Sequence, residues 1–110
     1  MIDWNRIKIL RDEIGEEDFP DVVEIFIEEV TEMIQNLRQT PKLETLGADL
    51  HALKGSALNL GFETFAQLCQ VGETAAANGL PDTIDLPPIL ECYDASKAVF
   101  LTGLENGEAA

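Results

Sequence analysis

The chain has 110 residues, which suits one domain over residues 1–110 with a single core. Its 21 acids against 7 bases give a formal charge of −14. This charge argues against nucleic acid and anionic membranes as partners, because both need a basic surface, and it favours a monomer. No apolar run reaches the roughly 18 residues of a membrane span and no signal peptide is visible, so we expect a cytoplasmic protein.

Apolar residues that recur every three or four positions predict five helices and no strand. The helices are expected at about residues 3–14, 18–39, 42–60, 62–77 and 85–104, and residues 105–110 are expected to be a frayed tail. Asp3 is the predicted N-cap of the first helix and Gly15 its C-terminal stop. Four long amphipathic helices with short connections predict an all-α, antiparallel up-and-down four-helix bundle, with the first helix as a short N-terminal addition.

The segment from Glu16 to Glu32 contains eight acids and no base. We interpret it as the solvated face of the second helix, because a charged face opposite an apolar stripe is the common pattern. The apolar stripes of the third and last helices lead us to expect Leu43 and Val99 to face inward.

The central feature of the sequence is its only histidine, His51, in the third helix. At about 100° per residue, the stripe that contains Leu50, Leu53 and Ala57 faces the core, and His51 points about 130° away from it, toward solvent. Lys54 lies one turn after His51, so an ammonium group flanks the imidazole.

Small residues surround His51 on its own face. Gly47 and Ala48 lie one turn before it, Gly55 lies one turn after it, and Leu58 follows on the same side. A glycine inside a helix costs about 1 kcal/mol relative to alanine. Two of them around one exposed residue indicate that another molecule must approach the backbone closely.

Several kinds of site fit the sequence poorly. A metal centre is not expected, since there is no second histidine and Cys69 and Cys92 lack zinc-ligand spacing. These cysteines lie in apolar helical patterns and are expected to be buried, free thiols. A hydrolase is not expected, since it would need a nucleophile, a base and an acid that converge in a cleft, and a smooth bundle face offers none.

Glu73, on the fourth helix, either reaches toward the third helix or is simply an exposed charge.

An exposed imidazole beside a cation suits phosphoryl transfer. Neutral imidazole is a nucleophile near neutral pH, and its attack on a phosphoryl group gives a phosphohistidine. Such transfer needs positioning and charge neutralisation more than a built-in base. The ammonium of Lys54 would steady the phosphate, and a partner protein could bring its own phosphate and Mg²⁺ to the ring.

The run His51-Ala-Leu-Lys54-Gly55-Ser-Ala, followed by Leu60-Gly61, resembles the His-x-Leu-Lys-Gly-Ser-Ala…Leu-Gly signature of histidine-containing phosphotransfer (Hpt) domains. Weaker resemblances extend it over about residues 2–78. They are Ile2-Asp3…Ile7…Leu10…Gly15 before the signature, and Cys69, Glu73 and Ala76 after it. Gly72 departs from the family pattern, which usually has leucine there, and we expect it to loosen the packing near Glu73.

The resemblance implies a bundle in which His51 carries a phosphoryl group on Nε2 and Lys54 contacts that group. It implies that the protein is a phosphocarrier without kinase activity or cofactor of its own, and that receiver domains or a hybrid histidine kinase dock around His51. The receiver would supply Mg²⁺, and docking would use Gly55, Leu58, the other small residues beside His51 and exposed parts of the second helix.

Two other interpretations stay open from the sequence. A non-catalytic helical adaptor would share the fold and the docking face, but it has no evident need for Lys54 and the small residues. The chain also fits the phosphoacceptor module of a larger histidine kinase, although the initiator Met and the complete set of helices lead us to expect a free-standing protein.

Overall fold

A computed structural model describes residues 1–108 of the chain. It contains the helices α1 (Trp4–Ile14), α2 (Phe19–Gln39), α3 (Leu43–Asn59), α4 (Glu63–Ala77) and α5 (Leu86–Glu105), and a short 3₁₀ turn, η1 (Pro81–Thr83). Each helix begins and ends within one residue of its predicted bounds. Within the described part there is no β-strand, only one isolated bridge between Ile2 and Phe62.

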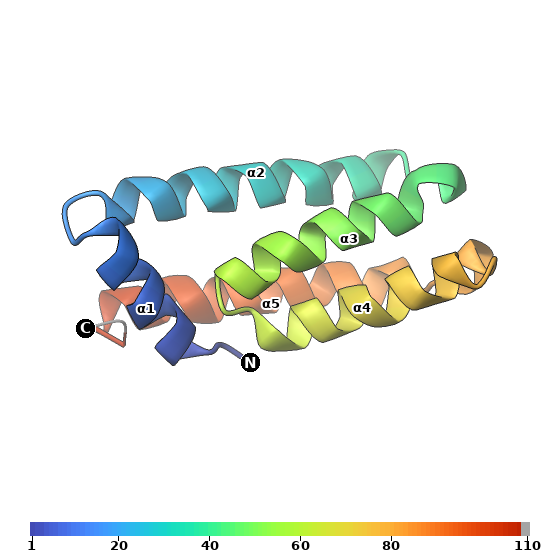
Figure 1. The fold of residues 1–110 in the computed structure, drawn as a ribbon. Coiled ribbons are helices and arrows are strands. Elements are labelled where there is room, and N and C mark those ends of the chain that lie inside the picture. The colour runs from blue at the N-terminus through green and yellow to red at the C-terminus, as the bar shows by residue number, and fades with distance from the viewer. Residues whose placement is uncertain (109–110) are drawn as a thin grey trace.

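The four long helices form an elongated bundle of about 43 × 23 × 21 Å. They run alternately in opposite directions along the bundle, and α1 packs across one end (Figure 1). The prediction of an all-α up-and-down bundle with an extra N-terminal helix is confirmed. None of the helices within residues 1–108 combines the length and the apolar character needed to cross a membrane.

The N-terminal segment is tied to the turn between α3 and α4. The backbone N–H of Asp3 donates to the carbonyl oxygen of Gly61 at 2.7 Å, and the N–H of Glu63 donates to the carbonyl oxygen of Met1 at 3.1 Å. Gly61 has φ +70°, and a Cβ there would lie 2.6 Å from the Asp3 carbonyl oxygen. The Asp3 side chain accepts from the N–H of Arg6 at 3.2 Å, so its prediction as the N-cap of α1 is confirmed.

Aromatic side chains fill the core near this end of the bundle. Phe62 packs edge-to-face on Phe100 with ring centroids 5.3 Å apart, and Trp4 stacks on Phe100 with ring centroids 5.9 Å apart. The indole of Trp4 sits over Gly103, where an added Cβ would lie 2.2 Å from the ring. Gly103 therefore provides the space that lets α1 pack on α5.

The inward directions expected for Leu43 and Val99 are wrong, because these side chains are 53% and 45% exposed. Leu43 is the first residue of α3 and lines a surface groove at that end. Val99 precedes Phe100, which takes the buried direction on α5, and so Val99 is turned about 100° away from the core.

The structure describes residues 105–108 of the predicted frayed tail as the end of α5 and a capping turn, and the fraying itself stays a prediction. Glu105 is the last residue of α5, and the N–H of Glu108 donates back to the carbonyl oxygen of Gly103 at 2.9 Å. Gly107, with φ +78°, makes this capping turn possible. The rest of the predicted tail, residues 109–110, lies outside the described residues.

Two other predictions about side chains are confirmed, the second of them in part. The acids from Glu16 to Glu32 are all exposed, as expected for a solvated face. Both cysteines are free thiols, as expected, and Cys69 is buried, but Cys92 is only half-buried where full burial was expected. Burial raises the pKa of Cys69 to about 12, so its thiol stays protonated and unreactive near neutral pH.

Candidate functional site

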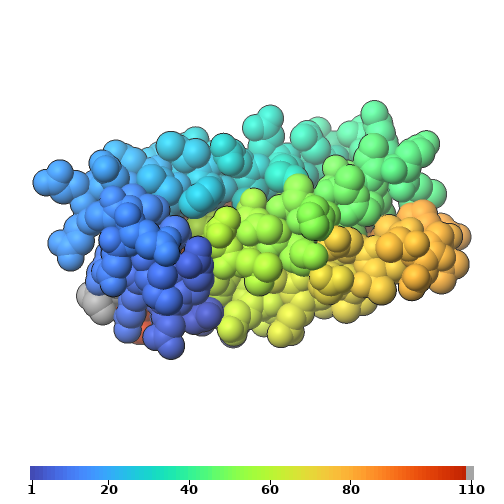
Figure 2. Space-filling model, viewed as in Figure 1, coloured from blue at the N-terminus to red at the C-terminus, as the bar shows by residue number. Residues whose placement is uncertain are grey.

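His51 lies in the middle of α3 with its side chain 69% exposed. Leu50 and Leu53, on the opposite face of the helix, are fully buried in the core. The outward direction predicted from the helical pattern is therefore confirmed. The face around His51 belongs to α3 and α4, whose surfaces meet along the side of the molecule shown in Figure 2.

Small residues bring α3 and α4 close together beside His51. A Cβ on Gly47 would lie 2.9 Å from the Cβ of Ala76 in α4, closer than two such carbons normally pack. On the buried side, a Cβ on Gly72 would lie 2.6 Å from Cδ1 of Leu50. The expectation that Gly72 loosens the packing near Glu73 is wrong, since this glycine is buried and allows the close approach of the helices.

This close approach places Glu73 of α4 between the two functional candidates of α3. One carboxylate oxygen, Oε1, lies 2.7 Å from Nδ1 of His51. The other, Oε2, lies 2.7 Å from Nζ of Lys54 and forms an ion pair with it. Of the two interpretations left open for Glu73, the structure supports the one in which it reaches the third helix.

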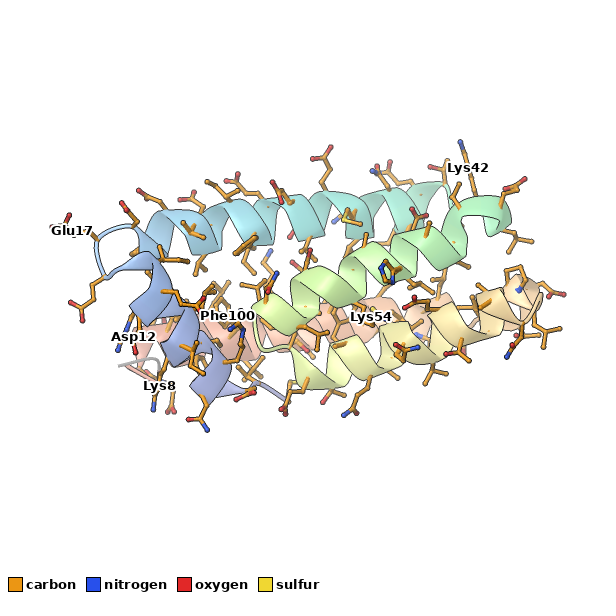
Figure 3. The ribbon with its side chains drawn as sticks, viewed as in Figure 1. Lys8, Asp12, Glu17, Lys42, Lys54 and Phe100 are labelled. Carbon is orange, nitrogen blue, oxygen red and sulfur yellow. The ribbon has the colours of Figure 1, made fainter. Side chains whose placement is uncertain are left out.

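Lys54 has a second partner on α4. Its Nζ donates to Oε1 of Gln70 at 2.8 Å, and Nε2 of Gln70 donates to Oγ1 of Thr74 at 3.0 Å. The lysine side chain, labelled in Figure 3, is only 20% exposed. Its ammonium is therefore held in one place, while the imidazole beside it is open to solvent.

The charges of this cluster fix the state of Glu73. The ammonium of Lys54 is the main cause that lowers the pKa of Glu73 below its ordinary value, and the contact with His51 adds to it, against a smaller opposing effect of burial. The carboxyl is therefore ionised at neutral pH and can only accept hydrogen bonds. Because Nδ1 of His51 contacts it, we assign the imidazole hydrogen to Nδ1, which leaves the lone pair of Nε2 free.

The surface on either side of this cluster is open and mostly apolar. A groove of about 720 Å³ next to His51 is lined by Leu43, by small residues such as Ala48 and Ala77, and by two glutamates. A second groove of about 390 Å³ next to Lys54 is lined by Leu58 and Ala66 together with the polar side chains Glu63, Gln67 and Gln70. Leu58 is 55% exposed. The positions predicted for docking thus lie at the surface around the imidazole.

The two glycines near His51 differ in what surrounds them. Nothing lies within 4 Å of a Cβ built on Gly55, so its bare backbone faces open space, as expected. Gly47 lines the groove beside His51, but its missing side chain primarily makes room for Ala76. The fold therefore explains by itself why position 47 is a glycine, and the role of Gly47 in docking stays a prediction.

Sequence reasoning missed Gln70 and Thr74. Gln70 lies three residues before Glu73 and Thr74 lies four residues after Gln70, so helical spacing would have placed Gln70 beside Glu73 and Thr74 beside Gln70 had Glu73 been fixed as a site residue. No group of three or more metal-ligating side chains occurs within residues 1–108.

Comparisons with known proteins match the same region. The sequence model of a family described as "Hpt domain" matches residues 21–99, which run from the first turn of α2 into α5 and include the whole cluster. Two curated relatives are described as phosphorelay protein LuxU, from Vibrio vulnificus strains YJ016 and CMCP6. Each is 27% identical over 112 aligned residues, which cover 97% of this chain and 97% of the relative. No solved structure matches the chain significantly.

Proposed function

The chain belongs to the Hpt domain family of histidine phosphotransfer proteins, and on this premise we propose that His51 accepts a phosphoryl group from the aspartate of one receiver domain and passes it to another. The observation that carries the proposal is the state of His51, whose ring is exposed while Glu73 holds Nδ1 at 2.7 Å. Because Nδ1 is occupied by Glu73 and the side chain is mostly exposed, we take Nε2 as the nitrogen that a partner reaches.

The transfer step follows from this geometry. The lone pair of Nε2 attacks the phosphorus of an aspartyl phosphate, so that a P–N bond forms while the bond from phosphorus to the carboxyl oxygen breaks and the aspartate leaves as carboxylate. The ring becomes positively charged, and the ionised Glu73 stabilises it through the Nδ1 hydrogen. Return transfer to a second receiver is the reverse of this step.

Lys54 has the role of neutralising charge on the phosphoryl group. Its ammonium is one helical turn from His51 and is held by Glu73 and Gln70 at 2.7 and 2.8 Å. Because the Lys54 side chain is held in place, less rotamer entropy is lost when it contacts the phosphate. Gln70 acts as a positioning residue, since Thr74 fixes its amide with the oxygen toward Lys54.

The partners follow from the same chemistry. In this proposed role the protein is a cytoplasmic monomer. It is a phosphocarrier without kinase activity of its own, since the cluster supplies a nucleophile and one cation. Receiver domains, free or within a hybrid histidine kinase, would dock over the surface formed by Gly47, Ala48, Gly55 and Leu58 and supply the Mg²⁺ that phosphoryl transfer needs.

The test is transfer of labelled phosphate from a phosphorylated receiver domain in the presence of Mg²⁺. We expect label that is labile in acid and stable in base, and that is lost in His51→Gln without a change in the unfolding temperature, because the side chain is 69% exposed. Label that persists in His51→Gln would overturn the proposal. No label from a broad panel of receivers with a folded sample would favour the adaptor.

Lys54 variants separate the carrier from the adaptor. We expect Lys54→Ala to slow transfer tenfold or more while the affinity for the unphosphorylated receiver changes less than twofold, because the side chain is mostly covered by Glu73 and Gln70. Gln70→Leu should slow transfer less, by a few-fold, because Glu73 still holds the ammonium. Equal loss of binding and transfer in Lys54→Ala would contradict the role assigned to Lys54.

A further inference from the structure

A second apolar groove lies at the end of the molecule where α1 turns into α2. This distal groove has a volume of about 510 Å³, and its apolar lining comprises Phe19, Val23 and Ile27 of α2 and Leu101 and Leu104 of α5. Arg11 of α1 also lines it. None of its lining residues belongs to α3 or α4, which carry the His51 cluster, so the two sites are separate.

The packing of α1 explains why the distal groove is open. Trp4 fixes α1 on α5 at Gly103, where the ring carbons occupy the space of the missing side chain. Leu101 is two residues earlier and points about 200° away from Gly103 around the helix. As a result α1 covers one side of α5 and leaves Leu101 42% exposed.

The rim of the distal groove is negatively charged. Glu24 and Glu28 of α2 line it, and they belong to the run of eight exposed acids between Glu16 and Glu32 that contains no base. Within residues 1–108, no ion pair involves any of these eight acids. An apolar floor beside an unneutralised acidic rim is complementary to an occupant with one apolar face and one basic face.

These features decide between kinds of occupant. A second copy of the chain and an anionic membrane would both be repelled, because the chain carries a formal charge of −14. The lining positions on α2 from Phe19 to Glu28 extend over about 13 Å at 1.5 Å per residue, which matches two to three turns of helix. We propose that the distal groove binds a short, cationic amphipathic helix of a partner protein.

Arg11 gives this interaction a direction. It is the one cation among the described residues that line the distal groove, and it lies on α1 rather than on the acidic α2. A cation favours the C-terminal end of a helix, where free carbonyl groups carry partial negative charge. The bound helix therefore points its C-terminus at Arg11 and lays its lysine and arginine residues along Glu24 and Glu28.

The test measures binding of a synthetic 14-residue peptide of leucine and lysine, patterned as an amphipathic helix, by calorimetry at physiological salt. A peptide with glutamate in place of lysine is the control and should not bind. Amide shifts in NMR spectra should change along α2 and α5 rather than around His51. Binding of both peptides alike, or shifts centred on the face of His51, would overturn the proposal.

Two matched pairs of variants locate the binding. Leu101→Ser should lower the affinity for the Leu/Lys peptide about tenfold. Val99→Ser, at a similarly exposed position outside the groove, should change this affinity less than twofold. Glu24→Lys combined with Glu28→Lys should likewise weaken binding tenfold or more. The same change of charge in Glu29→Lys combined with Glu32→Lys, on the same helix but outside the lining, should have a clearly smaller effect.

The outcome is decided by the difference within each pair. Equal weakening by the two double variants would mean diffuse attraction to an acidic protein and would overturn the proposal. Equal peptide affinities of the Leu101→Ser and Val99→Ser variants would overturn it as well. All substituted side chains are exposed, and circular dichroism melts of each variant verify that a lost affinity is not lost folding. Phosphotransfer through His51 is not needed for any of these readouts.

Discussion

Gly47 and Gly55 lie one turn before and one turn after His51, and we expect the same Gly→Ala change to alter stability differently at the two positions. The methyl group of Gly55→Ala meets no atom within 4 Å, so the variant keeps the full gain in helix propensity, about 1 kcal/mol. The methyl group of Gly47→Ala would lie 2.9 Å from the Cβ of Ala76. Overpacking of this kind costs about 1–3 kcal/mol, which cancels or exceeds the gain.

Thermal unfolding followed by circular dichroism measures both effects. For a domain of this size, 1 kcal/mol corresponds to about 4 °C in the unfolding midpoint. We therefore expect Gly55→Ala to melt about 4 °C higher than the wild type. Gly47→Ala should melt between the wild-type midpoint and about 8 °C below it. Gly47→Ala should cost less in the background of Ala76→Gly, which removes the contact. Equal stabilisation by both single changes would refute the reasoning from this contact.

The same variant tests the docking face. Gly55→Ala adds a methyl group to the open surface beside His51, so we expect slower phosphoryl transfer from a receiver in a protein that is more stable than the wild type. Thr102→Ala, an exposed change on α5 that also raises helix propensity, is the control and should leave the rate unchanged. An unchanged rate in Gly55→Ala would mean that docking does not need the bare backbone.

Three further predictions concern other parts of the fold. An alkylating reagent should modify the half-buried Cys92 in the native protein and spare Cys69, whose thiol is buried with a pKa of about 12, as peptide mass analysis can show. Because the pKa of Glu73 is lowered in the folded state, its stabilising effect is complete above the ordinary carboxyl pKa and is lost as the pH falls through the lowered value. Melting temperatures of the wild type and Glu73→Gln should therefore differ at neutral pH and converge in acid. Tyr93→Phe removes a hydrogen bond of 2.9 Å to Thr31 and should cost about 1 kcal/mol in denaturant unfolding, whereas no loss would mean that water replaces it.

The positions of the helices and the outward direction of His51 could be predicted from the sequence, because both depend on periodicity and caps within single segments. The stripe of Leu50, Leu53 and Ala57 fixes which side of α3 is buried, and it leaves His51 only one direction to point. The signature around His51 also indicated the family, and the family comparison agrees with it.

The partners of His51 and Lys54 were decided only by the tertiary structure. Glu73 was ambiguous and Gln70 was missed, because which residues of α4 face α3 depends on the rotation and axial offset of the two helices. The contact between Gly47 and Ala76 was missed for the same reason. The pattern of one helix specifies its buried side, whereas a contact between helices depends on how closely small residues allow the two helices to pack.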